Sequence, residues 1–145
     1  MSRLPGAVFA VVLSSLAAGA CRSPEAASIA FLAQGDTYFA AKKYDEASIE
    51  YRNAIQRTPL SAEAYYKLGE VQAAKSDVVG ALGSYIKAAG LSPGMVDAQL
   101  KAANLLLLAR KYEDAKNRLR AVLTKNPDNP DAVLMLGTAM AGLGS

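Results

Sequence analysis

Residues 28–60 read SIAFLAQGDTYFAAKKYDEASIEYRNAIQRTPL, and the chain repeats this pattern twice more. The repeats are recognised by residues of the same kind that recur 34 positions apart. The recurring sets are Phe31 and Tyr65; Gly35, Gly69 and Ala103; Ala47, Ala81 and Ala115; Tyr51, Tyr85 and Leu119; and Pro59, Pro93 and Pro127. A fixed period of this length predicts stacked units that each contain two helices and a turn.

The residue types at the recurring positions explain how each unit would pack. The small residues at the eighth and twentieth positions let two helix backbones approach closely, and large residues fill the space beside them. In the first unit the large residues are Phe31, Tyr38 and Tyr51. The proline at the thirty-second position ends the second helix, because it lacks an N–H and clashes with the preceding turn. Stacking such units buries their apolar faces.

Capping residues and turn residues predict where the helices begin and end. Acidic residues favour the start of a helix, basic residues favour its end, and serine, aspartate and asparagine cap its first turn. We expect helices at Ser28–Ala41, Tyr44–Arg57, Ala62–Ala74, Val78–Ala89, Met95–Ala109 and Tyr112–Lys125, and a seventh that starts at Asn129-Pro130-Asp131. Two interpretations stay open for Gly80 and Gly83, which fall inside a helix: tight packing, or a hinge or partner contact.

This pattern resembles the tetratricopeptide-repeat (TPR) family from Ser28 to the C-terminus. The resemblance implies an all-α, right-handed superhelical solenoid with repeats at residues 28–61, 62–95 and 96–129. Residues 130–145 would then form the first helix of a partial fourth repeat. The chain departs from the family pattern at Gln34, Gln72, Gln99 and Val122, where apolar, aromatic or alanine residues are commoner.

The resemblance also implies a concave groove that binds a segment of another protein. The groove residues carried over from the family are Leu32, Asp36, Phe39, Glu63, Tyr66, Glu70, Leu100, Asn104 and Leu107, with Ile29, Ala73 and Asp97 beside them. Their acidic members would prefer a basic or amine-bearing partner. TPR domains that clamp a C-terminal carboxylate use Lys, Asn and Arg here. Because this chain has Leu32 and Asp36 in its first repeat, and Lys101 alone as a candidate cation, we expect no such clamp.

Residues 1–27 have the pattern of a targeting segment followed by a tether. Residues 4–20 form an uncharged apolar run that is short for a membrane span and suits a signal peptide. The segment Ala18-Gly19-Ala20-Cys21 is similar to the lipobox of bacterial lipoproteins, although Ala18 stands where that motif prefers leucine. We therefore expect a signal peptide at 1–20 and a lipidated Cys21 with a tether at 21–27. An ordinary signal peptide or an uncleaved anchor is the alternative.

The same resemblance predicts a location in the bacterial cell envelope, facing the periplasm. Arg22 stands where an aspartate would retain a lipoprotein in the inner membrane, which favours the outer membrane. A secreted or inner-membrane-anchored protein is the alternative.

Composition narrows the chemistry open to this chain. Its 145 residues have no histidine, one cysteine and a formal charge of +3. We find no catalytic motif and no metal-ligand spacing, and therefore expect no enzyme, no metal and no cofactor besides the lipid on Cys21. Basic and acidic residues are interspersed, which argues against nucleic-acid binding.

The last helix is unusual for the end of a repeat array, because it is apolar on most sides. Its apolar residues include Val133, Leu134, Met135, Leu136, Met140 and Leu143. Terminal helices of solenoids need a polar outer face. The resemblance to the TPR family implies a protein-interaction scaffold. The apolar last helix leaves two alternatives: a structural module that self-associates through residues 130–145, or the N-terminal part of a longer repeat protein. No motif that we find identifies the partner or the pathway. By architecture alone the chain resembles the N-terminal part of TPR lipoproteins that accompany PEP-CTERM-associated and exopolysaccharide export systems or outer-membrane assembly.

Overall fold

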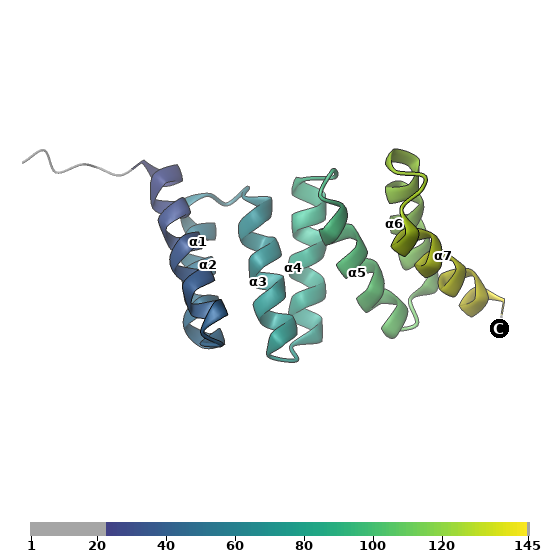
Figure 1. Cartoon of the computed structure of the whole chain (residues 1–145), viewed down its shortest axis with the longest axis horizontal. Coiled ribbons are helices and arrows are strands. Elements are labelled where there is room, and N and C mark those ends of the chain that lie inside the picture. Colours follow the sequence, from purple (N-terminus) through teal and green to yellow (C-terminus); the bar gives the residue numbers. More distant parts are fainter. Residues whose placement is uncertain (1–22, 145) are drawn as a thin grey trace, which may run out of the picture.

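The computed structural model describes residues 23–144, and these form seven α-helices and no strand. The helices are α1 (Pro24–Ala40), α2 (Tyr44–Arg57), α3 (Ala62–Ala74), α4 (Val78–Leu91), α5 (Val96–Leu108), α6 (Tyr112–Lys125) and α7 (Pro130–Leu143). Each helix packs against its neighbours in the chain. The result is a single row of helix pairs with α1 at one end and α7 at the other (Figure 1). The predicted all-α repeat fold is confirmed.

Most predicted helix ends are confirmed, but the start of α1 is wrong. The predicted tether reaches Ala27, whereas α1 begins at Pro24. The reason is local: the Ser23 hydroxyl accepts a hydrogen bond from the Ala26 N–H (3.1 Å), Pro24 occupies the first helical position, and Glu25 lies in the first turn. This combination stabilises a helix start. The helix therefore begins four residues earlier than the repeat period indicates.

The turn inside each repeat has the same backbone conformation three times. Lys42, Ser76 and Arg110, which lie 34 residues apart, adopt φ values of 58°, 63° and 57°. In each case the next N–H donates back to a carbonyl five residues earlier, as from Lys43 to Tyr38 at 2.9 Å. This is the hydrogen-bond pattern that closes a helix C-terminus. The sequence period is therefore matched by a period in the backbone.

The core of the first two repeats is a tyrosine ring packed on a glycine. Tyr51 and Tyr85 are 2% and 1% exposed. A Cβ added to Gly35 would lie 2.4 Å from the Tyr51 ring, and one added to Gly69 would lie 2.7 Å from the Tyr85 ring. The third repeat has Ala103 and the smaller Leu119, both fully buried, at the same places. A large tyrosine ring is thus paired with a glycine in the first two repeats, and a smaller leucine is paired with an alanine in the third.

The two glycines of α4 have different roles. A Cβ on Gly80 would lie 2.1 Å from the Asp77 carboxylate, which caps α4, and 2.5 Å from the Gln72 amide. Gln72 also reaches the Ser84 hydroxyl at 2.5 Å and so joins α3 to α4 at a position where the family has an aromatic residue. For Gly80 the packing interpretation is therefore supported. An added Cβ at Gly83 meets nothing within 4 Å, so packing does not explain that glycine.

Helix α7 keeps much apolar surface exposed. Leu134 is 73% exposed, Met140 is 55% exposed and Val133 is 53% exposed. Its inner side packs on α6 and α5, where Ala132 and Ala139 are fully buried. Over the described part of the chain, none of the helices combines the length and apolar character that crossing a membrane requires.

Candidate functional site

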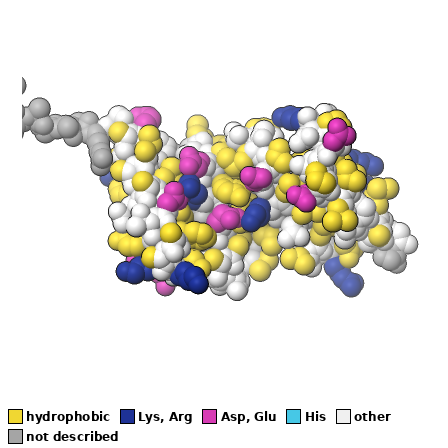
Figure 2. Space-filling model, viewed as in Figure 1, with side chains coloured by type: hydrophobic (Ala, Val, Ile, Leu, Met, Phe, Trp, Pro, Cys, Tyr) yellow, Lys and Arg dark blue, Asp and Glu magenta, His cyan; other side chains and the backbone are white. Residues whose placement is uncertain are grey.

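The candidate site lies on the face formed by α1, α3, α5 and α7, which we call the odd-helix face. In Figure 2 acidic side chains and interspersed basic ones form a band across the middle of this face. The predicted groove residues belong to these helices. Several of them also contribute to packing between the repeats.

A chain of polar contacts crosses the junction between the first two repeats. The Tyr51 hydroxyl, on α2, donates a hydrogen bond to the Asp36 carboxylate at 2.7 Å. Lys67, on α3, forms an ion pair with the same carboxylate at 2.8 Å and 3.0 Å. Glu63 lies 3.9 Å from the Lys67 amine. The Asp36 carboxylate is therefore paired with a hydroxyl from α2 and with an amine from α3.

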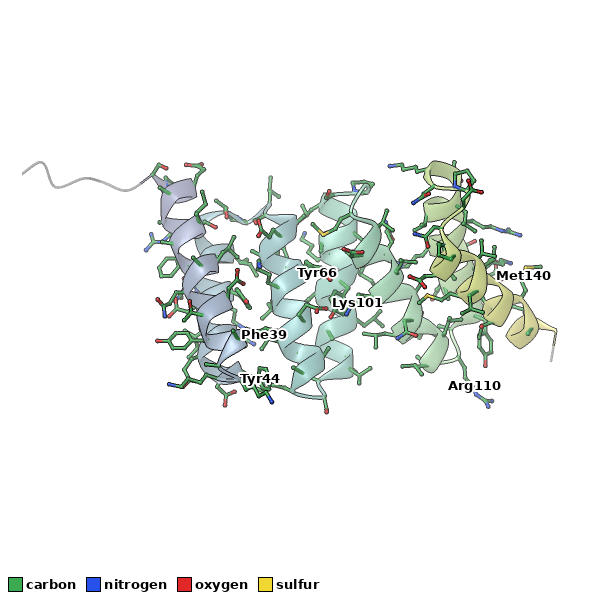
Figure 3. All side chains as sticks on the ribbon, in the orientation of Figure 1. Phe39, Tyr44, Tyr66, Lys101, Arg110 and Met140 are labelled. Atoms are coloured by element: carbon green, nitrogen blue, oxygen red, sulfur yellow. The ribbon has the colours of Figure 1, made fainter. Side chains whose placement is uncertain are left out.

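The next junction repeats this arrangement 34 residues later. The Tyr85 hydroxyl donates to the Glu70 carboxylate. Lys101 reaches from α5 to the same carboxylate at 3.2 Å (Figure 3). We call the two sets, Tyr51–Asp36–Lys67 and Tyr85–Glu70–Lys101, the polar ladder. The ladder fixes the side chains of Asp36 and Glu70 and neutralises their negative charges, which we expected to attract a basic partner.

The tyrosines of the ladder are held in their neutral form. Burial raises the pKa of Tyr51 far above its usual range, and the hydrogen bond to Asp36 and the charge of Asp36 raise it further. Burial and then Glu70 have the same effect on the pKa of Tyr85. Each phenol therefore keeps its proton and donates it to a carboxylate, a charge-assisted hydrogen bond.

The ladder stops at the third junction, and a hollow opens there. The equivalent positions hold Asn104, Leu119 and Met135, which provide no acid, hydroxyl or amine. Between α5 and α7 lies a hollow of about 310 Å³. It is lined by Asp97, Leu100, Lys101, Asn104, Asp131 and Met135. We call it the α5–α7 hollow.

Three polar side chains of the α5–α7 hollow are available to a ligand, while the fourth, Lys101, is paired with Glu70 at 3.2 Å. Among residues 23–144, neither Asp97 nor Asp131 forms an ion pair, and the Asn104 amide makes no side-chain hydrogen bond. All three residues are exposed. Leu100 and Met135 are partly buried and form its apolar wall. The hollow thus combines an apolar wall, a free amide and two carboxylates.

The other predicted groove residues are spread over the odd-helix face. Leu32 is 8% exposed and belongs to the core, because it packs among residues of α1, α2 and α3. The edge of its side chain, with Ile29 and Glu63, also lines a separate hollow of about 530 Å³. Phe39 packs on Tyr44, with ring centroids 5.6 Å apart (Figure 3). Tyr66 packs on Tyr85 at 5.7 Å.

Leu107 is partly buried against the core cluster around α5, α6 and α7. The structure therefore brings Leu100 and Asn104 together in one hollow and does not bring Phe39 or Leu107 there.

Two lining residues of the α5–α7 hollow were missed by sequence reasoning. Asp131 and Met135 belong to α7, at the second and sixth positions of the fourth unit, and the groove assignment stops at the third unit. Extending the 34-residue period by one step from Glu63 and Asp97 would have found Asp131. It would not have found Met135, because the equivalent residues Lys67 and Lys101 were not assigned to the groove. Cys21, the predicted lipidation site, lies outside the described residues. Within those residues no group of three potential metal ligands is present.

Comparison with known proteins gives matches over most of the chain. A family model described as TPR repeat matches residues 35–76, and one described as tetratricopeptide repeat matches residues 73–136 and 106–145. Human superkiller complex protein 3 is 26% identical over 108 residues, which are 74% of this chain but 7% of that protein. The chain thus spans less than a tenth of this relative.

Solved structures share the fold at low sequence identity. The first TPR domain of Spaghetti (RPAP3), bound to the HSP90 peptide SRMEEVD, has a TM-score of 0.75 at 21% identity, covering 86% of this chain and 99% of that domain. The MamA protein has a TM-score of 0.72 at 22% identity, covering 81% and 64%. YrrB, described as a TPR protein with an unusual peptide-binding site, has a TM-score of 0.69 at 23% identity, covering 79% and 59%.

Proposed function

Because the chain belongs to the tetratricopeptide-repeat family, whose domains are protein-interaction modules, we propose that it binds an extended segment of a partner protein on the odd-helix face. The observation that carries the proposal is the α5–α7 hollow. There the polar ladder ends and a free amide, two carboxylates and an apolar wall face solvent together. Elsewhere on this face the carboxylates of Asp36 and Glu70 are already paired.

The lining of the hollow indicates what the segment should contain. The Asn104 amide can both donate to and accept from a peptide backbone. A lysine or arginine side chain would lie between Asp97 and Asp131, and an apolar side chain would pack on Leu100 and Met135. The volume of about 310 Å³ is at the small end of the usual range for ligand pockets, so it suits one or two side chains.

An acidic C-terminal segment does not suit this hollow. The Spaghetti (RPAP3) domain holds the acidic peptide SRMEEVD. In this chain the cation that lines the hollow, Lys101, is engaged by Glu70 at 3.2 Å, while Asp97 and Asp131 would repel a carboxylate. We therefore propose a partner segment with a basic residue next to an apolar one.

Peptide binding gives the direct test. Three extended peptides that differ only in one central residue, lysine, alanine or glutamate, should bind in that order when measured by fluorescence anisotropy. With the lysine peptide, replacing Asp97 and Asp131 by asparagine should weaken binding about tenfold, which corresponds to about 1.4 kcal/mol. Asn104→Ala should weaken the binding of all three peptides alike, because the Asn104 amide would contact the peptide backbone, which the three peptides share.

Asp128→Asn is the matched control, because Asp128 is an exposed acid in the loop before α7 and does not line the hollow. Equal affinity for the three peptides, or an equal loss in the control variant, would contradict the assignment of the hollow.

We further propose that this scaffold is tethered to a bacterial envelope membrane by a lipid on Cys21, within an export or envelope-assembly system, and that the outer membrane is its location. The support is the sequence Ala18-Gly19-Ala20-Cys21 after an apolar run. Because α1 begins at Pro24, the lipidated residue would be about 10 Å or less from the first helix. Such a short tether would hold the N-terminal repeat against the membrane surface.

Intact mass measurement tests the tether. The full chain is produced in a bacterium and its membrane fraction is compared with that of Cys21→Ser. We expect the loss of residues 1–20 and an added acyl mass in the wild type, and neither in the variant. An unmodified Cys21 in the membrane fraction would exclude the lipoprotein proposal and would leave the peptide-binding proposal untouched.

A further inference from the structure

The exposed side of α7 corresponds to a surface that is covered in the first two repeats. On α1 and α3 the equivalent glycines, Gly35 and Gly69, lie under the tyrosine rings of α2 and α4. On α7 the equivalent residue is Gly137, and an added Cβ there meets nothing within 4 Å. Leu134 and Met140, on either side of it, are 73% and 55% exposed. α7 therefore presents a helix-packing surface that residues 23–144 leave uncovered.

This surface is complementary to itself in an antiparallel arrangement. Gly137 lies at the middle of α7, which runs from Pro130 to Leu143. Leu134 precedes Gly137 by three residues and Met140 follows it by three, so both lie near the same side of the helix. If two copies cross at Gly137, the missing side chains let the backbones approach. Leu134 of each copy then packs on Met140 of the other, as an isologous interface requires.

The charge on α7 favours the same arrangement. Asp131 is its one charged residue, and it lies in the first turn. Antiparallel pairing places the two Asp131 side chains at opposite ends of the contact, roughly 20 Å apart at 1.5 Å per residue. Parallel pairing would bring the two carboxylates side by side. The rest of the surface is neutral, so no like charges oppose its contact with a second copy.

We propose that two copies of this chain associate through α7, antiparallel and centred on Gly137. Within the described residues α7 lies at one end of the row, so the pairing would join two rows end to end (Figure 1). Met135, which lines the α5–α7 hollow, is two residues from Gly137 and so lies on nearly the opposite side of α7. Asp131, the other α7 residue that lines the hollow, is three residues before Leu134, so the two surfaces adjoin near the start of α7.

Sedimentation of the full chain, solubilised and untagged, tests the association. We expect a monomer–dimer equilibrium in the micromolar range, because the contact is one helix wide and smaller than standard interfaces. Leu134→Glu should raise the dissociation constant at least tenfold. Val79→Glu is the matched control and should leave it unchanged, because Val79 is 84% exposed on α4, away from this surface. Circular dichroism confirms that each variant keeps its helices.

Two further measurements test the geometry of the pair: the first tests the antiparallel register and the second tests the crossing at Gly137. The chain with Leu134→Glu and the chain with Met140→Lys should each dimerise poorly alone and should pair when mixed, since residue 134 of one copy faces residue 140 of the other. In a Cys21→Ser background, Gly137→Cys should form a disulfide-linked dimer on oxidation, and Val79→Cys should not. A monomer at all concentrations, an open-ended polymer, or no recovery on mixing would overturn the proposal.

Discussion

Replacing Gly69 with alanine is expected to lower the free energy of unfolding by about 2 kcal/mol, although alanine is the better helix former. The added Cβ would lie 2.7 Å from the Tyr85 ring, which is 1% exposed. The ring is confined because its hydroxyl donates to Glu70 and its face packs on Tyr66. Steric strain in a filled core therefore outweighs the gain in helix propensity. Urea unfolding of the two proteins measures the difference.

Gly137→Ala is the matched control, since it is the same change at the same position of a repeat. Within one copy no atom lies within 4 Å of its added Cβ, so at concentrations where the chain is monomeric only helix propensity is altered. We expect the free energy of unfolding to stay the same or to rise by up to about 1 kcal/mol. A similar loss at Gly69 and Gly137 would show that ring contact is not the cause.

The third repeat suggests how the strain at Gly69 can be relieved. It carries Ala103 with Leu119 where the second carries Gly69 with Tyr85. Gly69→Ala and Tyr85→Leu should therefore couple: the double variant should be more stable than the sum of the single effects by about 1 kcal/mol or more. Additive effects would mean that the pairing of small and large residues in this chain is coincidental.

The helices were predictable because their signals are local. Both ends of α2 and α6, and the start of α3, follow from charges and capping residues within one turn of the end. The start of α1 departs from the repeat period because Ser23-Pro24-Glu25 is such a local signal and lies before the first repeat. A repeat period therefore sets the spacing of equivalent positions and not the length of the first helix.

The polar ladder was not predicted, although its spacing is present in the sequence. Asp36 and Lys67 are 31 residues apart, as are Glu70 and Lys101. Recognising the pairs needs the register between neighbouring repeats, which decides whether the two helices bring these side chains together. The α5–α7 hollow is harder still to predict from the sequence, because it depends on side-chain volumes and on the absence of the charged ladder residues at the third junction. It lies where the neutral residues Asn104 and Met135 replace an acid and an amine.

Raising the pH above about 10 is expected to destabilise the protein steeply through the two tyrosines of the ladder. In the unfolded chain a tyrosine loses its proton near pH 10. In the folded protein burial, followed by Asp36 for Tyr51 and by Glu70 for Tyr85, raises each pKa well above that value, so the phenols stay protonated. The folded state then binds more protons than the unfolded state, and stability falls as pH rises, by about 1.4 kcal/mol per pH unit for each tyrosine.

The phenylalanine variants isolate this contribution, because other groups also ionise in this range. At neutral pH, Tyr51→Phe and Tyr85→Phe should each cost about 1–3 kcal/mol, since each removes a hydrogen bond to a carboxylate. Above pH 10 each variant should lose stability less steeply than the wild type, so that the curves converge near pH 11 or beyond. Urea unfolding from pH 7 upward measures both quantities. Parallel curves would show that the phenols ionise equally in both states, which is incompatible with their burial against Asp36 and Glu70.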